Sequence, residues 1–233
     1  MGGIRRNKHT LLLGVLIATI LWSSFSHRFV LSPVVSDVLM TVIVLAVLLV
    51  IFTGRLERIA AFAVATVTVL VNWSRYVVAP QEGHLLQPVL FHMLMVAFLA
   101  FTVYVILRDI FAARAITRDD VVGTVCGYLL AAAMWANLYV MVEILAPGSF
   151  SLTPEIAKEV TSWDGRIAMF NYFSLVTLTT VGYGDITPLH APAPALAALE
   201  AVFGQFYIAI VVAQLVGLRI AQALAPQPPD REA

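Results

Sequence analysis

Six long apolar runs, separated by short polar stretches, dominate the pattern of the chain. Each run is near the ~20 residues that a helix needs to cross about 30 Å of hydrocarbon, and none alternates between apolar and polar positions as a barrel strand does. In lipid, only helices and closed barrels satisfy their backbone hydrogen bonds. The pattern therefore predicts an all-α membrane protein with six spanning helices, at Thr10–Val30, Val34–Phe52, Ile59–Ala79, Leu86–Leu107, Val121–Leu145 and Ala195–Ile220.

A cleavable signal peptide is the other interpretation of the first run. Arg5, Arg6 and Lys8 precede an apolar core at Leu11–Trp22, as they do in such segments. No small-residue cleavage site of the A-x-A type follows this core. The sequence therefore favours a first helix that is retained.

The longest interruption lies between the fifth and sixth runs. Thr153, Pro154 and Glu155 can open a short surface helix, and Asp164 can cap a second helix at about 165–178. This second helix is apolar and aromatic but too short to cross a bilayer. It is typical of a re-entrant element, which is tolerated at membrane depth only where protein buries it or where it lines a water-filled cavity.

Composition supports lipid as the solvent of this chain. Of its 233 residues, 61% are hydrophobic and 12% are charged, and the mean hydropathy is +0.91. A soluble domain has about 45–50% apolar and about 25% charged residues. The formal net charge is zero, which gives no indication of a nucleic-acid partner, and the single cysteine, Cys126, cannot form a disulfide within the chain.

Lysine and arginine positions predict the orientation. With the amino terminus inside, ten basic residues lie on the inner side (Arg5, Arg6, Lys8, Arg55, Arg58, Arg108, Arg114, Arg118, Arg219 and Arg231) and four outside (Arg28, Arg75, Lys158 and Arg166). We therefore expect a multi-pass protein of the plasma or inner membrane with both termini in the cytoplasm. The expected parts are a cytoplasmic amino terminus at 1–9, a four-helix membrane domain at 10–107, a cytoplasmic linker at 108–120, a pore region at 121–220 and a short cytoplasmic tail at 221–233.

A short motif follows the re-entrant helix directly, and its residues are Thr179, Thr180, Val181, Gly182, Tyr183, Gly184 and Asp185. With its context, this motif resembles the selectivity filter and pore loop of the potassium channel superfamily. The resemblance covers Val121–Ile220. It implies an outer helix at 121–145, an outer loop at 146–164, a pore helix at 165–178, the filter at 179–185 and an inner helix at 195–220.

Potassium selectivity needs a ring of oxygens that replaces the hydration shell of the ion. Backbone carbonyls can all point at one axis only in a strand with partly left-handed dihedrals, which Gly182 and Gly184 permit at little steric cost. The resemblance implies that K⁺ is bound by the carbonyls of Thr180, Val181, Gly182 and Tyr183, with the Thr180 hydroxyl at the inner entrance. It also implies that Val181 and Tyr183 pack against the pore helix and that Asp185 lies at the outer mouth. The carboxyl end of the pore helix carries a partial negative charge that would steady the cation.

One filter strand supplies one carbonyl to each layer of oxygens, and a closed ring needs four. The chain has a single copy of the motif, so we expect a homotetramer. The expected function is passive K⁺ flux, without an enzymatic reaction and without a cofactor other than the permeant ion, with membrane lipids as further partners. A pore fold kept for a non-conducting sensor or accessory role is the alternative from another class.

The pore helix departs from many members of this family at two positions. Tyr172 and Phe173 stand where a tryptophan pair is common, and Phe173 has no N–H to donate to Asp185. Tyr172 is expected to brace the neighbourhood of Tyr183 instead. With one hydrogen bond fewer, the filter is expected to inactivate readily, and Phe173→Trp is expected to slow the decay of current.

Four further residues have two interpretations each. Glu143 either braces the loop after the filter or reaches water at the membrane interface. Glu200, as an acid in a membrane, is expected to be paired, either with that loop or at the base of the pore helix. Gly204 and Gly217 resemble hinge positions of the inner helix, although a small residue also permits close helix packing.

The first four helices resemble the sensor domain of six-helix channels in number only. A voltage sensor needs arginines at every third position of its fourth helix, and none lies between Leu86 and Leu107. We expect Arg75 to reach the membrane interface, or else to pair with Glu82 or a lipid headgroup, and His92 and Asn137 to form hydrogen bonds between helices.

Overall fold

The computed structural model describes residues 8–25, 32–52, 54–77, 85–113, 116–159 and 163–224. Most of these residues are helical, in agreement with the predicted class. The helices are α1 (Lys8–Phe25), α2 (Ser32–Val50), α3 (Arg55–Ser74), α4 (Leu86–Ala112), α5 (Arg118–Leu145), α6 (Pro154–Glu159), α7 (Trp163–Leu178) and α8 (Ala193–Leu224), and the strands are β1 (Phe150–Leu152) and β2 (Ile186–Pro188).

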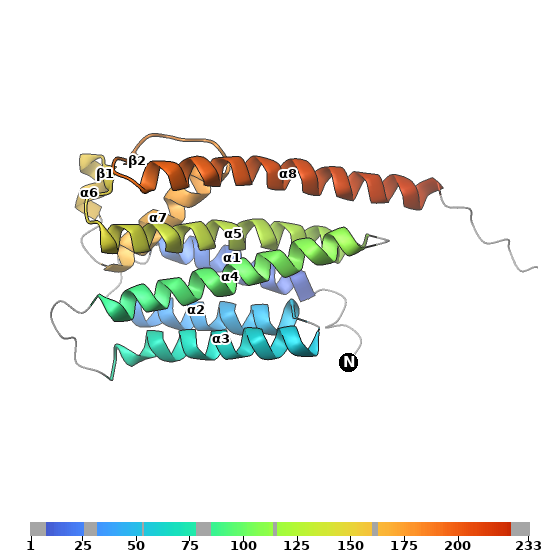
Figure 1. Cartoon of the computed structure of the whole chain (residues 1–233), viewed down its shortest axis with the longest axis horizontal. Helices are drawn as coiled ribbons and strands as arrows, with labels where there is room; N and C mark the ends of the chain where they lie inside the picture. The colour runs from blue at the N-terminus through green and yellow to red at the C-terminus, as the bar shows by residue number, and fades with distance from the viewer. Residues whose placement is uncertain are drawn as a thin grey trace, which may run out of the picture.

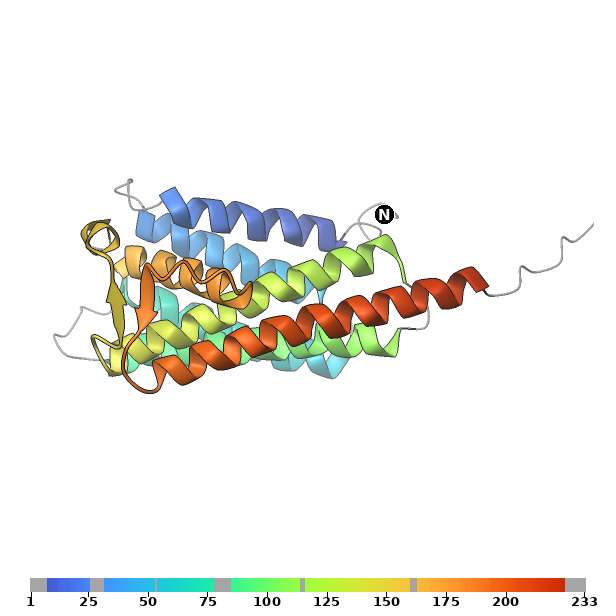
Figure 2. The ribbon, with the colours of Figure 1, turned by 90° about the horizontal axis from the view of Figure 1, so that it is seen from above.

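The long helices lie side by side, with α5 at the centre of the arrangement (Figure 1). This helix contacts α1, α4, α7 and α8. The short helix α7 lies near one end of the bundle, close to α6 and the two strands, and the far end of α8 extends past the other helices (Figure 2). Helix α5 therefore joins α1 and α4 to α7 and α8, and α7 also contacts α1 and α2 directly.

Four of the described helices, α3, α4, α5 and α8, are long and apolar enough to cross a membrane by length and composition. Two shorter apolar stretches, His9–Trp22 and Val34–Val50, lie in α1 and α2. These properties support a membrane protein. The predicted end of the first helix at Val30 falls outside the described residues, as does Glu82.

Helix α5 begins three residues before the sequence indicated, and its first turn has a capping box. The Thr117 hydroxyl accepts a hydrogen bond from the Asp120 N–H, and the Asp120 carboxylate accepts one from the Thr117 N–H. Such reciprocal bonds satisfy two amide donors that a helix start otherwise leaves unpaired. They set the point at which the chain re-enters the helical bundle.

Polar side chains in the interior of α1–α5 bind one another. His92 Nδ1 lies 2.7 Å from Asn137 Oδ1, which confirms the predicted bond between helices. The guanidinium of Arg75 forms an ion pair with Asp37, a buried carboxylate on α2 that was not among the expected partners. Tyr76 donates to the same carboxylate at 2.6 Å. This pair was not visible in the sequence, because Asp37 and Arg75 are 38 residues apart and meet only in the folded chain.

Candidate functional site

The strand after α7 has an alternating backbone conformation. Thr180, Gly182 and Gly184 have φ values of +59°, +57° and +78°. The two glycines adopt the left-handed region as expected, whereas Thr180 is the only non-glycine residue with positive φ among the described residues. Every second residue from 180 to 184 is therefore left-handed, as expected for a strand whose carbonyls face one side.

The N–H groups of this strand bind the last turn of α7. Thr180 N donates to Thr177 O at 2.9 Å, and Val181 N and Gly182 N donate to Val176 O at 2.9 and 3.4 Å. Among the described residues, no hydrogen bond ends on the backbone carbonyls of residues 180–184. The strand is thus anchored through its donors, and its acceptors remain free for a cation.

The backbone carbonyls at the carboxyl end of α7 have more hydrogen-bond partners than those at the end of an isolated helix. Leu175, Val176 and Thr177 each accept a hydrogen bond from the backbone of the strand, and the Tyr128 hydroxyl donates to Leu178 O at 3.0 Å. These four carbonyls are the ones that a helix end leaves without internal partners. The partial negative charge predicted at this end is therefore already partly compensated by protein donors.

Tyr172, rather than its neighbour, contacts the carboxylate at the end of the motif. Its hydroxyl donates to Asp185 Oδ2 at 2.6 Å. Partial burial, together with the hydrogen bond to Asp185, raises the pKa of Tyr172 to about 12, so the donor stays protonated at neutral pH. The expectation that the pore helix gives Asp185 one hydrogen bond fewer is therefore wrong, because Tyr172 supplies that bond. Phe173 is buried instead, with its ring edge-on to Tyr139 at 5.0 Å.

Two short strands, which the sequence did not reveal, hold the segments on either side of the motif together. Strands β1 and β2 pair antiparallel, with Ser151 opposite Thr187. Glu143 accepts hydrogen bonds from Gly148 N at 2.9 Å and Ser149 N at 3.1 Å, and Leu189 N donates to Ser149 O at 2.8 Å. Glu143 therefore braces the segment after the motif indirectly, through the turn before β1.

Glu200 lies fully buried where α5, α7 and α8 meet. The Tyr139 hydroxyl on α5 and the Ser174 hydroxyl on α7 both contact its carboxyl group. The expectation that Glu200 pairs at the base of the pore helix is correct, and the expectation that it pairs with the loop after the filter is not. This cluster joins the three helices directly behind the motif.

The inner helix passes very close to the end of α7. A Cβ atom added at Gly204 would lie 2.1 Å from Leu178 O, whereas one at Gly217 would meet nothing within 4 Å. Close packing therefore accounts for Gly204, and a hinge at either glycine stays a prediction. The next residue, Gln205, places its amide nitrogen 3.5 Å from the Thr180 hydroxyl. The sequence analysis missed Gln205, because nothing local distinguishes one polar residue of an apolar helix.

The side chains of Val181 and Tyr183 are 52% and 71% exposed within the single chain. The expected packing of these side chains against the chain's own pore helix is therefore not formed. Tyr183 is a large aromatic residue, and the described part of this chain leaves most of its surface uncovered.

Residues 127–218 match the model of a family described as ion channel. The matched segment runs from α5 through α7 and the motif into α8, and α1–α4 lie outside it. No curated protein matches the chain. The family match and the apolar helices support an ion channel in a membrane, a class of protein that conducts rather than catalyses.

Proposed function

We propose that this chain is one subunit of a homotetrameric, potassium-selective channel of the plasma or inner membrane, with six spanning helices and both termini in the cytoplasm. The observation that carries the proposal is the strand at 180–184. The N–H groups of Thr180, Val181 and Gly182 are bound to α7, the carbonyls of the strand are without partners among the described residues, and φ is positive at residues 180, 182 and 184. Rings of such carbonyls replace the water shell of K⁺.

The geometry of one strand requires further copies. A single strand offers one carbonyl in each layer, and the exposed Val181 and Tyr183 side chains need a protein surface that the chain itself does not supply. Four copies around an axis supply both the ring of carbonyls and the covering protein surface. They give K⁺ sites at the carbonyls of Thr180, Val181, Gly182 and Tyr183. The Thr180 hydroxyl, held by Gln205, then lies at the inner entrance.

Opening is not driven by a voltage sensor of the arginine-rich kind. Helix α4 has no arginine before Arg108, near its inner end, and Arg108 forms ion pairs with Glu57 on α3 and with Asp109. A charge fixed in this way at the edge of the bilayer moves through little of the membrane potential. We therefore expect the open probability to change little with voltage.

The test is the reversal potential of the purified protein in planar bilayers, with K⁺ on one side balanced by Na⁺ on the other. We expect reversal near the K⁺ equilibrium potential and little dependence on voltage. A mass measurement in detergent establishes the number of chains. Reversal near zero would contradict K⁺ selectivity, and absence of current in a tetrameric protein would contradict conduction.

A pair of glycine variants separates the filter from general backbone strain. Gly182 and Gly148 both have positive φ, at +57° and +84°, and both have open space around an added Cβ. Gly182→Ala is expected to abolish the current, and Gly148→Ala, which places the same strain in the turn before β1, is expected to preserve K⁺ selectivity. An equal loss in both would remove the support for a filter role of this strand.

A further inference from the structure

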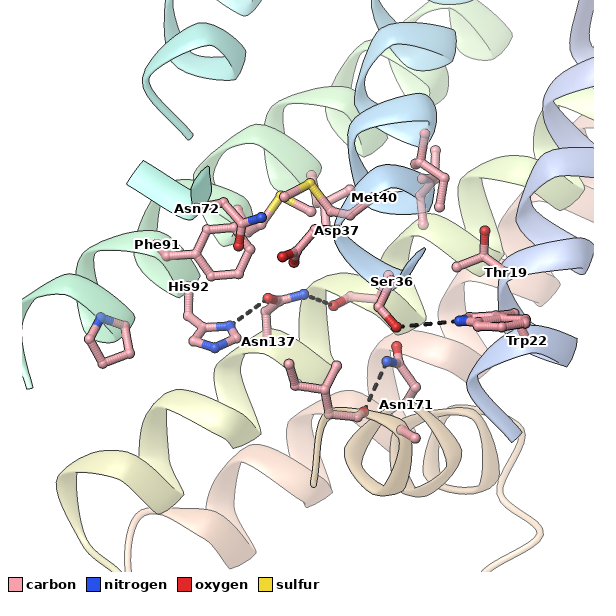
Figure 3. A pocket seen from close by; sticks show the side chains of 18 of the residues that line it. Thr19, Trp22, Ser36, Asp37, Met40, Asn72, Phe91, His92, Asn137 and Asn171 are labelled. Carbon is pink, nitrogen blue, oxygen red and sulfur yellow. Dashed lines mark hydrogen bonds between the residues drawn. The ribbon is translucent and has the colours of Figure 1, made fainter. Parts of the chain in front are cut away.

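A cavity of about 200 Å³ lies away from the proposed pore, between α1–α5 and α7. Side chains from all six helices reach it, and Figure 3 shows several of them converging on one space. Neither the filter strand nor the inner helix α8 contributes to its lining. Conduction as proposed above makes no use of this space.

The cavity contains an unpaired polar group. Asn72 of α3 lines it and is only 3% exposed, and its side-chain Nδ2 has no hydrogen-bond partner among the described residues. Buried polar side-chain atoms nearly always have a partner, so each exception needs an explanation. A bound molecule with an oxygen at this point would satisfy the amide.

The other amides around the cavity are already satisfied. Asn137 binds His92, and its Nδ2 donates to Ala133 O at 2.8 Å. Asn171 of α7 donates to Ile167 O at 3.0 Å. The Asn72 side chain is therefore the group that still needs a partner from outside, while Asn171 serves as a matched comparison in the same space.

The charge of the cavity is balanced. Asp37 faces it, but Arg75, which also lines the cavity, neutralises this carboxylate, and Tyr76 donates to the same oxygen. An ion would meet no unpaired charge here and would lose its hydration. The site therefore favours an uncharged molecule.

Most of the lining is apolar, and two methionines, Met40 and Met95, supply flexible side chains to it. An apolar cavity of about 150 Å³ is large enough for benzene. The present cavity therefore suits a molecule somewhat larger than benzene, and it is too small for a two-chain lipid.

We propose that this cavity binds a small, uncharged amphiphile with a ring-sized apolar body and one hydroxyl group that faces Asn72. The apolar body displaces water from the apolar part of the lining, and the hydroxyl supplies the missing partner of the amide. Ile167, Ala168 and Asn171 of α7 also line the cavity. A bound molecule would therefore contact the same helix that anchors the filter.

The experiment uses the full chain in lipid nanodiscs and benzyl alcohol as the probe, with ethylbenzene as a control of similar size that lacks the hydroxyl. A diazirine-bearing benzyl alcohol is photoactivated, and its adducts are mapped by mass spectrometry. We expect adducts on residues that line the cavity. We expect benzyl alcohol to compete about 5- to 100-fold better than ethylbenzene, since it satisfies a buried donor.

Variants show whether Asn72 is the residue that distinguishes benzyl alcohol from ethylbenzene. Asn72→Leu should bring the two competitors within about twofold of each other, and Asn171→Leu should leave their difference unchanged. If Asn72→Leu fails to fold, Asn72→Ser takes its place, because serine keeps a polar group. This variant should narrow the difference in competition between benzyl alcohol and ethylbenzene. Adducts spread over the lipid-facing surface, equal competition in the unaltered protein, or an unchanged preference in Asn72→Leu would overturn the proposal. Because binding is measured without current, failure here is distinct from failure of the channel proposal.

Discussion

The buried acid behind the filter strand gives the sharpest prediction. The Ser174 hydroxyl lies 2.7 Å from the carbonyl of Ala132 and also contacts the Glu200 carboxyl. A hydroxyl has one hydrogen and cannot donate to both acceptors. A protonated Glu200 resolves this, because it donates to Ser174, which then donates to Ala132, while Tyr139 donates to the other oxygen. Glutamine reproduces this pattern and alanine does not.

The expected loss of stability in Glu200→Ala follows from the unpaired donor and the cavity that the alanine leaves. Glu200→Ala removes the acceptor of the buried Tyr139 hydroxyl, and an unpaired buried donor costs about 1–3 kcal/mol. The missing atoms leave a cavity on the order of 50 Å³, which at about 24 cal/mol per Å³ adds about 1 kcal/mol. The total of about 2–4 kcal/mol corresponds to a melting temperature lower by roughly 5–15 °C in a chain of this size. Glu200→Gln should cost less than about 1 kcal/mol.

The assay is thermal unfolding of the purified protein in detergent, followed by tryptophan fluorescence. Glu155, on the exposed side of the short helix α6, provides the control, because Glu155→Ala and Glu155→Gln remove no buried contact. Both control variants should melt within about 2 °C of the parent. If Glu200→Ala and Glu200→Gln melt together, the hydrogen-bond argument for this cluster is wrong.

Three further predictions rest on other contacts. Gly204→Ala should lower the melting temperature, because its Cβ would overlap the pore-helix carbonyl 2.1 Å away, whereas Gly217→Ala should leave it equal or slightly raised; identical effects would contradict the close packing. Tyr172→Phe removes the donor to Asp185 and should speed the decay of current. Because the pKa of Tyr172 is raised to about 12, its stabilising bond is present below pH 10 and is lost between about pH 10 and 12. Decay rates that change between pH 6 and 9 would count against this role of Tyr172. Asp37→Ala leaves a half-buried arginine unpaired and should cost about 1–3 kcal/mol, part of which returns when that arginine is also replaced by an apolar residue; full additivity in the double variant would refute the coupling.

The contacts of Tyr172 and Phe173 also change one expectation from the sequence. Phe173→Trp was expected to restore a bond to Asp185, but Phe173 is buried against an aromatic cluster and does not face that carboxylate. A larger ring at this position overpacks the cluster. Neighbouring residues on a helix point about 100° apart, so the choice between them needed the orientation of α7 relative to the strand.

The sequence alone determined the features that depend on local composition and spacing. Long apolar runs predict helices in lipid because the backbone has no other way to satisfy its hydrogen bonds there. The short apolar helix and the glycines at 182 and 184 were also visible, because only glycine adopts a left-handed conformation at little steric cost. These features depend on neighbours along the chain and not on which helices meet.

The tertiary structure alone decided the contacts between segments that lie far apart in the sequence. The Arg75–Asp37 pair joins α2 to the end of α3, the Glu200 cluster joins three helices, and the unpaired amide of Asn72 faces a cavity that six helices line. Apolar runs of similar composition can pack in many registers with similar hydrophobic gain, since that gain depends on area and not on direction. The side chains that meet in the interior are therefore set by the packing, which the order of residues along one helix does not reveal.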